Sequence, residues 1–340
     1  MLLAKYKSFL PINNKTPKIT IGEGNTPLIK SQNIGPSIGI KNLYFKLEGT
    51  NPTGSFKDRG MVMCIAKAIE KKASAIICAS TGNTSASAAA FGSYFNLKTV
   101  IMVPKKGITS GKLAQTSLYG AKILAINDNF DKALLLAINL SKSTPITLVN
   151  SVNPFRIEGQ KTASFEIVDS LKKNPDMVCI PVGNAGNITA YWKGFKDYFK
   201  ASKISKLPQM HGFQAKNAQT IASAIRIKNP ASLKGALNAS QESNGSITKV
   251  TDDEILHAYR LLASQEGIFC EPASAASLAG LLNISKKIKL NNKIIVCIIT
   301  GSGLKDPETA INNTPNKIID IEASHENLAG ILRNIDKFIE

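Results

Sequence analysis

The stretch Glu48-Gly49-Thr50-Asn51-Pro52-Thr53-Gly54-Ser55-Phe56-Lys57-Asp58-Arg59-Gly60 joins a strand pattern to a helix pattern. Residues 43–47 alternate and are rich in aromatic side chains, which predicts a β-strand. The glycines and the proline that follow predict a tight turn. Ser55 and Asp58 have the spacing of a capping box, so a helix is expected to begin here and to run to about Lys71.

This helix would place Lys57 in its first turn, which is an unusual position for a cation. The amino end of a helix carries about half a positive charge, so the pKa of the lysine is expected to fall, and more so in a dry site. A neutral amine can attack a carbonyl group and hold an aldehyde such as pyridoxal phosphate as a Schiff base. The alternative is a surface lysine whose stem lies along the protein, and this stretch alone leaves both interpretations open.

Length and composition are those of a globular protein with a sizeable core. The chain has 340 residues, enough for two α/β domains or one large one, and 43% of them are hydrophobic. No stretch approaches the roughly 18 apolar residues of a membrane span, and no secretory signal is recognised, so we expect a cytoplasmic protein without membrane contact. The five cysteines and three histidines lie far apart, which predicts reduced core cysteines and no metal site.

The formal net charge of +18 raises the question of a nucleic-acid partner. Only five of the 42 basic residues are arginine, the lysines are spread along the chain, and one tryptophan offers little for base stacking. We therefore favour a solvated, lysine-rich surface over nucleic-acid binding. A positive field would also attract small anionic substrates.

Apolar runs alternate with helix patterns along most of the chain. Strands are expected at residues 75–79, 99–103, 121–126, 146–149, 177–182, 209–214 and 293–300. Helices are expected after residues 80–87 and at 110–118, 130–141, 154–173, 188–199, 251–266 and 272–284, with a capping box at Thr251 and a surface loop at 230–245. Strands that are apolar throughout predict an α/β fold with largely parallel sheets covered by helices.

Four turns follow predicted strands, at the sheet edge where open α/β folds bind ligands. Beside the Lys57 turn, the loop Gly183-Asn184-Ala185-Gly186-Asn187 could close its backbone N–H groups on a phosphate, although it lacks the residues of a nucleotide loop. Asn83 could donate to a phenolate oxygen of an aromatic ring, and the Thr300 hydroxyl could pair with a ring nitrogen. Taken singly, each is also explained as an ordinary cap or turn residue.

Four motifs in this order resemble the threonine synthases, and together they span roughly residues 20 to 310. They are Pro52-Thr53-Gly54-Ser55-Phe56-Lys57-Asp58-Arg59-Gly60, Ser80-Thr81-Gly82-Asn83-Thr84-Ser85, Pro181-Val182-Gly183-Asn184-Ala185-Gly186-Asn187 and Thr300-Gly301-Ser302-Gly303-Leu304-Lys305-Asp306-Pro307. The resemblance implies the two-domain tryptophan-synthase-β-like fold of fold type II pyridoxal-phosphate enzymes, and a homodimer. Residues 53–152 would form a small mobile α/β domain, and 1–52 plus 153–340 a large cofactor-binding domain.

The resemblance also implies the roles of the residues in these motifs. Lys57 would form the Schiff base with pyridoxal 5'-phosphate and act as the catalytic residue. Asn83 would contact the ring oxygen of the cofactor, and Thr300 its ring nitrogen. The phosphate of the cofactor would be held by Gly183, Asn184, Ala185, Gly186 and Asn187.

The implied substrate, O-phospho-L-homoserine, carries a second phosphate. Candidates for holding it are Thr84, Ser151, Asn153, Arg156 and Asn187, which offer hydroxyls, amides and a guanidinium. The alternative for Arg156 is a surface ion pair with Glu158 or Asp169. In the implied reaction, that of a carbon–oxygen lyase acting on a phosphate ester, Lys57 moves protons at Cα and Cβ. Phosphate leaves from Cγ, and water adds at Cβ to give L-threonine.

Serine/threonine dehydratases, cysteine synthases and other β-replacement enzymes of the same fold are the alternatives within this class. Dehydratases usually have an all-glycine phosphate loop and a Ser-x-Gly-Asn-His turn, whereas here the loop is Gly-Asn-Ala-Gly-Asn and the turn ends in Gly-Asn-Thr. Both differences favour threonine synthase. A different class of hypothesis is a non-enzymatic binding protein with a basic surface that contacts RNA, which is disfavoured because a decayed site would not be expected to keep all four motifs.

Overall fold

The computed structural model describes residues 1–105, 110–227, 230–314, 328–330 and 333. The chain divides into two compact units, Met1–Pro307 and Glu308–Glu340. Both sheets and all four predicted turns lie in the first unit. The short helix α13 (Pro307–Asn313) begins at the boundary between the units.

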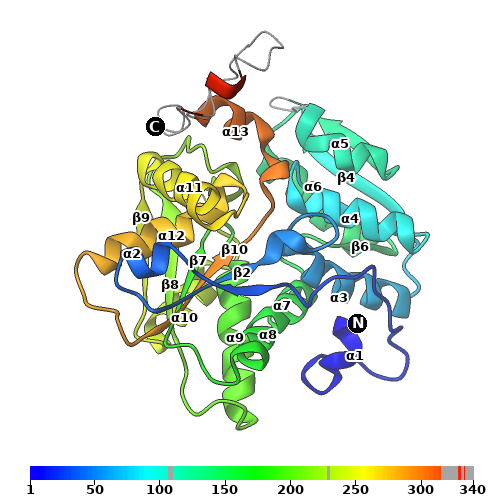
Figure 1. Ribbon diagram of the computed structural model, residues 1–340. Coiled ribbons are helices and arrows are strands. Elements are labelled where there is room, and N and C mark those ends of the chain that lie inside the picture. The colour runs from blue at the N-terminus through cyan, green and yellow to red at the C-terminus, as the bar shows by residue number, and fades with distance from the viewer. Residues whose placement is uncertain (106–109, 228–229, 315–327, 331–332, 334–340) are drawn as a thin grey trace. The chain divides into compact units, whose positions relative to one another are not determined.

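The larger sheet has six strands, of which five run parallel and β1 at the edge runs antiparallel to β2. Its order is β1 (Leu28–Lys30), β2 (Asn42–Leu47), β10 (Ile294–Ile299), β7 (Met177–Pro181), β8 (Gln209–Ala215) and β9 (Ser246–Val250). Figure 1 shows α11 (Asp252–Glu266) and α12 (Pro272–Ser285) above strands β7 and β8, and α9 (Gly186–Lys200) and α10 (Leu233–Glu242) below them. Helices on both faces explain why the central strands are apolar throughout.

The smaller sheet has four parallel strands in the order β5 (Lys122–Ile126), β4 (Lys98–Pro104), β3 (Ala75–Ala79) and β6 (Ile146–Leu148). The helices associated with it are α3 (Lys57–Glu70), α4 (Asn83–Tyr94), α5 (Ser110–Leu118) and α6 (Phe130–Ser143). Ala133 and Ala137 of α6 pack on Ile77 and Met102 of the sheet. The predicted α/β fold with largely parallel sheets is confirmed.

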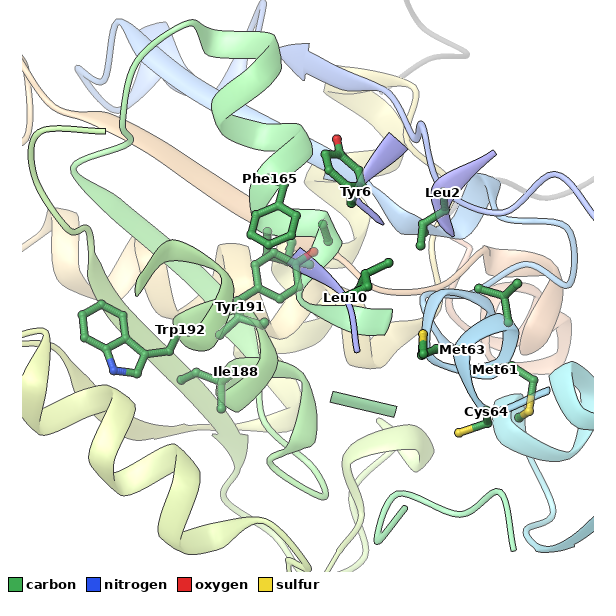
Figure 2. Packing of buried hydrophobic residues seen from close by; sticks show 14 of the residues in the cluster. Leu2, Tyr6, Leu10, Met61, Met63, Cys64, Phe165, Ile188, Tyr191 and Trp192 are labelled. Atoms are coloured by element: carbon green, nitrogen blue, oxygen red, sulfur yellow. The ribbon is translucent and has the colours of Figure 1, made fainter. Parts of the chain in front are cut away.

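The remaining elements are helices and single helical turns. They are α1 (Leu2–Lys5), η1 (Lys7–Phe9), α2 (Ile34–Ser37), η2 (Glu48–Thr50), α7 (Pro154–Gln160), α8 (Thr162–Leu171), η3 (Ser223–Ile225) and η4 (Gly303–Lys305). The longest two of them pack against α3 and α9. The N-terminal segment is anchored to α8, because the ring of Tyr6 lies 5.2 Å from that of Phe165 (Figure 2). Phe165 in turn stacks on Tyr198 of α9 at 4.2 Å between ring centroids. These aromatic contacts join the start of the chain to its central core.

The capping box predicted at Ser55 is not formed, whereas the one predicted at Thr251 is. Helix α3 begins at Lys57 after Phe56 and has no side-chain cap. The Asp58 carboxylate instead accepts hydrogen bonds from the Thr53 backbone and hydroxyl at 2.8 and 2.7 Å, and from Ser87 at 2.6 Å. Asp58 is buried, and these three hydrogen bonds satisfy its carboxylate in the interior.

Two further expectations about helices were wrong. The helix predicted at 154–173 is interrupted at Lys161, whose buried ammonium lies 2.7 Å from both Glu158 and Asp197. The surface loop predicted at 230–245 contains helix α10, followed directly by strand β9. The buried face of α10 consists of small residues, Ala236 and Ala239, which is why the sequence there resembles a loop.

The cysteine prediction agrees with the structure, since all five cysteines are buried and free. Within the described ranges, no group of three or more histidine, cysteine or acidic side chains could hold a metal ion. No helix in that same part of the chain is long and apolar enough to cross a membrane.

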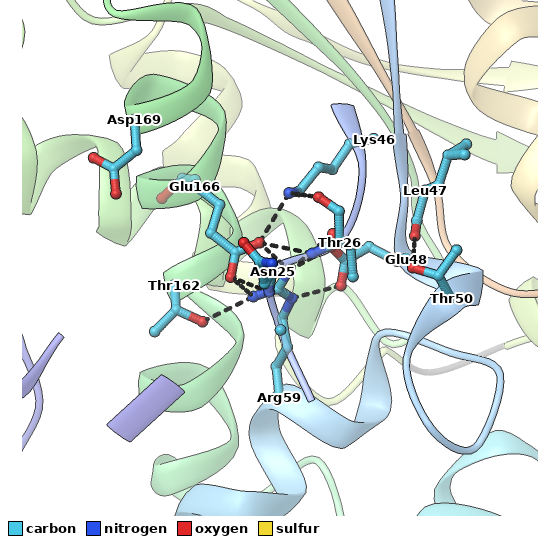
Figure 3. A network of polar contacts seen from close by, with 12 residues as sticks. Asn25, Thr26, Lys46, Leu47, Glu48, Thr50, Arg59, Thr162, Glu166 and Asp169 are labelled. Carbon is cyan, nitrogen blue, oxygen red and sulfur yellow. Dashed lines mark hydrogen bonds and ion pairs between the residues drawn. The ribbon is translucent and has the colours of Figure 1, made fainter. Parts of the chain in front are cut away.

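A buried cluster of charges fixes the first turn of α3. The guanidinium of Arg59 lies 2.6 Å from Glu48, after β2, and 2.6 Å from Glu166 of α8 (Figure 3). Lys46 of β2 lies 2.9 Å from the same Glu166 carboxylate. Two cations and two anions therefore balance in the interior, and the backbone N–H of Asn25 donates to Glu166 at 2.7 Å. Buried charges persist when they are paired in this way.

We predict that Glu166→Gln lowers the free energy of unfolding by about 3–5 kcal/mol, because it leaves a buried cation without its anion. Urea denaturation would measure this loss. Lys196→Gln is the matched control, since Lys196 pairs with Glu242 on the surface and its loss should cost less than about 1 kcal/mol. Equal losses in the two variants would contradict a structural role for the cluster.

Candidate active site

A cavity of about 770 Å³ lies at the carboxyl ends of β3, β7 and β10. Its volume is in the range of small-molecule and cofactor sites. The structure brings all four predicted turns to this cavity. The lining includes Lys57, Thr84, Asn83, Ser151, Arg156, Gly183, Asn184, Ala185, Gly186, Asn187 and Thr300.

Lys57 is the first residue of α3 and lies in the cavity wall, with its Nζ 4.1 Å from the ring centre of Phe56. The pKa of its amine is lowered to about 7, first by burial and then by the Arg156 guanidinium, while Glu271 acts in the opposite direction. The direction is the expected one, and burial in a dry site is the largest cause, with the Arg156 cation as a cause that the sequence did not indicate. A lysine in this state can act as a nucleophile or base near neutral pH.

Arg156 of α7 is only 1% exposed, yet no carboxylate in the described part of the chain lies within ion-pair distance of it. Its Nη1 donates to the Val149 carbonyl at 3.0 Å, and its buried Nε has no partner among the described residues. The alternative ion pair is not formed, because Glu158 pairs with Lys161 instead. Burial lowers the pKa of Arg156. A buried guanidinium in this state is a ready site for an anion.

The loop before α9 has the features of a phosphate cradle. Ala185 adopts a left-handed conformation (φ +64°), and α9 begins at Gly186, so the first N–H groups of this helix have no intrahelical acceptor. Asn187 is buried, and both polar atoms of its side chain lack a partner within the described residues. The side chain of Asn184 is occupied elsewhere, because its Oδ1 accepts a hydrogen bond from the Ala231 backbone N–H at 3.2 Å.

Asn83 and Thr300 both contact one carboxylate that the sequence reasoning missed. The Asn83 side-chain amide donates to the two oxygens of Glu271 at 3.2 and 3.0 Å. The Thr300 hydroxyl lies 3.4 Å from the same carboxylate and 2.9 Å from the hydroxyl of Ser274. Glu271 directly precedes α12. The sequence feature that could have identified it is a single acidic residue, between Cys270 and Pro272, in a largely apolar stretch.

Asn153 is not among the residues that line the cavity. Its Oδ1 accepts from the Phe155 backbone at 3.0 Å and caps α7, while its Nδ2 donates to the Leu148 carbonyl at 2.7 Å. Its amide is therefore occupied in holding the end of β6 to the start of α7. The structure gives no support to its predicted contact with a substrate phosphate.

The cavity wall combines the Lys57 amine, whose pKa is lowered, with the Asn83 amide, the Thr300 hydroxyl and the first N–H groups of α9. This set of groups fits a phosphorylated aromatic aldehyde. A model of the family described as pyridoxal-phosphate dependent enzyme matches residues 19–301. Solved structures agree with this fold, among them maize serine racemase, with a TM-score of 0.75 at 19% identity over 92% of this chain and 94% of the other. Threonine deaminase isoform 2 from Solanum lycopersicum gives a TM-score of 0.72 at 22% identity, over 85% and 87% of the two chains. At these identities the likeness shows the fold alone.

Curated relatives indicate which kind of pyridoxal-phosphate dependent enzyme this chain is similar to. A threonine synthase from Halalkalibacterium halodurans is 56% identical over 92% of this chain and 91% of the relative. That from Bacillus sp. (strain ULM1) is 54% identical over 97% and 98%, and that from Methanocaldococcus jannaschii is 45% identical over 97% and 87%. The chain belongs to the threonine synthase family of pyridoxal-phosphate dependent enzymes. Its cofactor is pyridoxal 5'-phosphate, and it is a lyase.

We predict that the Lys57 amine of the apoprotein, which carries no cofactor, titrates with a midpoint of about 7, against about 10.4 for an ordinary lysine. Competitive labelling with acetic anhydride across a pH series, read by mass spectrometry of the Lys57 peptide, measures this midpoint. Arg156→Gln should move it to higher pH, because a neighbouring positive charge disfavours the ammonium form. Arg226→Gln, an exposed arginine of the same cavity wall, is the control and should leave it unchanged. A midpoint near that of an ordinary lysine would contradict the lowered pKa of Lys57 in this cavity.

Proposed function

We propose that this chain catalyses the conversion of O-phospho-L-homoserine and water to L-threonine and phosphate. The observation that carries this proposal is the buried, carboxylate-free Arg156 in the same cavity as the Lys57 amine. It gives the cavity an anion site in addition to the loop before α9. A cofactor and a substrate that each carry a phosphate would occupy one site each, and the threonine synthase relatives support this choice.

The residues that would hold the cofactor come from four turns. Lys57 would bind it covalently, Asn83 and Thr300 would contact its ring, and the backbone of Gly183, Asn184, Ala185 and Gly186, with Asn187, would hold its phosphate. The chemistry that the bound cofactor supplies is an electron sink for the carbons next to the substrate amino group.

Lys57 is the residue that would move protons. An amine with a pKa of about 7 is present in both protonation states near neutral pH, so its Nζ can remove a proton from the substrate Cα and one from Cβ. Phosphate then leaves from Cγ, water adds at Cβ, and a proton is returned at Cγ and at Cα. The positive charge of Arg156 helps to keep the free amine neutral. A substrate phosphate at Arg156 would offset that charge, and the Lys57 amine would become more basic when the substrate is in place.

Arg156 would bind the substrate phosphate, together with the hydroxyls of Thr84 and Ser151 and the amide of Asn187. These donors would bind the phosphate without competition, because no carboxylate of the described residues lies within ion-pair distance of the guanidinium. A phosphate held there at the start of α7 is oriented for departure from Cγ, and the same donors stabilise it as it leaves.

The test is an assay of phosphate release from O-phospho-L-homoserine by the holoenzyme. We predict that Arg156→Gln raises KM by about 10- to 100-fold, because a charge-assisted contact is lost, while the cofactor absorbance is unchanged. Arg226→Gln is the matched control and should keep the wild-type KM. If Arg156→Gln loses the cofactor, Arg156 contacts the cofactor and not the substrate phosphate, and the proposed role is wrong.

A faster deamination of L-serine or L-threonine than release of phosphate would identify a dehydratase instead. The homodimer, the cytoplasmic location and the division into a small domain at 53–152 and a large domain at 1–52 plus 153–340 stay predictions. Sedimentation analysis of the holoenzyme would test the first of them.

A further inference from the structure

Glu271 is a buried carboxylate in the cavity that the reaction outlined above does not use. Its residue is 5% exposed, and although it precedes α12, its side chain makes no cap on that helix. The carboxylate lies against the end of β10, where a Cβ added to Gly301 would be 2.5 Å from its Oε1. A glycine at position 301 therefore leaves the space that the carboxylate occupies.

Its hydrogen bonds join two parts of the site that come from different sheets. Asn83 begins α4, after β3 of the four-stranded sheet, and Thr300 follows β10 of the six-stranded sheet. Asn83 donates to both carboxylate oxygens at 3.0 and 3.2 Å, and the Thr300 hydroxyl lies 3.4 Å from Oε1. One side chain thus contacts both residues that would face the cofactor ring.

We propose that Glu271 is a positioning residue, which orients the Asn83 amide, and with it Thr300, for the ring of pyridoxal phosphate. The proposal rests on the cofactor contacts proposed above for Asn83 and Thr300. Glu271 acts through these two residues and is not itself assigned a proton transfer.

The chemistry of the amide explains why such a residue is needed. The Asn83 side chain has a carbonyl end that only accepts and an amino end with two hydrogens. Because Glu271 accepts from the amino end, this end is directed toward the carboxylate. One N–H shared between the two carboxylate oxygens leaves the second hydrogen to donate to a phenolate oxygen. Without the carboxylate the amide can turn over and present its carbonyl oxygen, which would repel that phenolate.

The surroundings of Glu271 keep the carboxyl in place. Lys57 and Lys305 face it from α3 and η4, and Cys270 precedes it in the chain. Burial raises the pKa of Glu271, while the Asn83 amide and the two lysines act in the opposite direction. An acid buried among these groups accepts hydrogen bonds in either protonation state, so Asn83 keeps its partner.

The experiment is a titration of the apoprotein with pyridoxal phosphate, followed by absorbance. Glu271→Met removes both oxygens at similar volume, with Glu271→Ala as a second acceptor-free variant, and circular dichroism checks that each is folded. We expect Kd for the cofactor to rise about tenfold or more and the absorption maximum to shift. Glu271→Gln keeps an acceptor oxygen and should restore Kd to within about threefold.

A double-mutant cycle with Asn83→Ala separates positioning from a general structural role. If Glu271 acts through Asn83, the double variant Glu271→Met/Asn83→Ala binds the cofactor about as weakly as the weaker single variant. Glu23→Gln is the matched control, because Glu23 is also a buried carboxylate but bonds to Thr20 and Ile21 and does not line the cavity. Its Kd and absorption maximum should equal those of the wild type.

Wild-type binding by the acceptor-free variants, additive effects in the cycle, or the same loss in Glu23→Gln would each overturn the proposal. Lys57→Ala, assayed in parallel, distinguishes this failure from failure of the proposed function. If Lys57→Ala loses phosphate release from O-phospho-L-homoserine while the cycle is additive, only the role of Glu271 is wrong. If Lys57→Ala retains release, the proposed function itself is wrong.

Discussion

The pairing of Arg59 with Glu48 and Glu166 is the contact on which the site depends. Arg59 lies in the first turn of α3, two residues after Lys57, so whatever fixes Arg59 also fixes the reactive lysine. Glu48 follows strand β2 of the six-stranded sheet, and Glu166 belongs to α8 (Figure 3). The ion pairs therefore hold the start of α3 to the six-stranded sheet, while the rest of the helix packs in the core.

Two buried arginines of adjacent helices illustrate two uses of a buried charge. Burial alone would lower the pKa of Arg59, but Glu48 and Glu166 raise it above its usual value, and this cation stabilises the fold. Burial lowers the pKa of Arg156, which has no such carboxylate among the described residues and is available to a ligand. The two helices cross closely, because a Cβ on Gly60 would lie 2.6 Å from the Arg156 Nε. Glycine at this crossing lets Arg156 reach the cavity beside Lys57.

Much of the fold was predictable because it depends on local sequence patterns, namely hydrophobic runs, turn residues and helix caps. Hydrophobic patterns identified the strands of the two sheets except β1 and β9, and the turns after them identified the cavity, since parallel strands end at a common edge. The Thr251 cap was predictable because its partner Glu254 is three residues away. The same reasoning failed at Ser55, where Asp58 turns to Thr53 and to Ser87, a residue of another helix.

What the sequence could not supply is the choice of distant partners. Nothing in the chain order indicates that Glu166 meets Arg59 or that Glu271 meets Asn83, since these pairs are 107 and 188 residues apart. Asn153 was predicted to contact a phosphate because an amide can donate to one. Its amide is instead hydrogen-bonded to Leu148 and Phe155, which are close to it in the chain. Residue type therefore indicated the chemistry of the site, whereas burial and partners decided which residues are free to perform it.

Borohydride reduction of the holoenzyme, followed by peptide mapping, tests the role of Lys57 most directly. Reduction makes a covalent link between cofactor and lysine permanent, so mass spectrometry can locate it. We predict that the reduced cofactor is found on the peptide containing Lys57 and is absent from Lys57→Ala. Its location on Lys305, which also lines the cavity, or on no lysine at all would contradict the role assigned to Lys57.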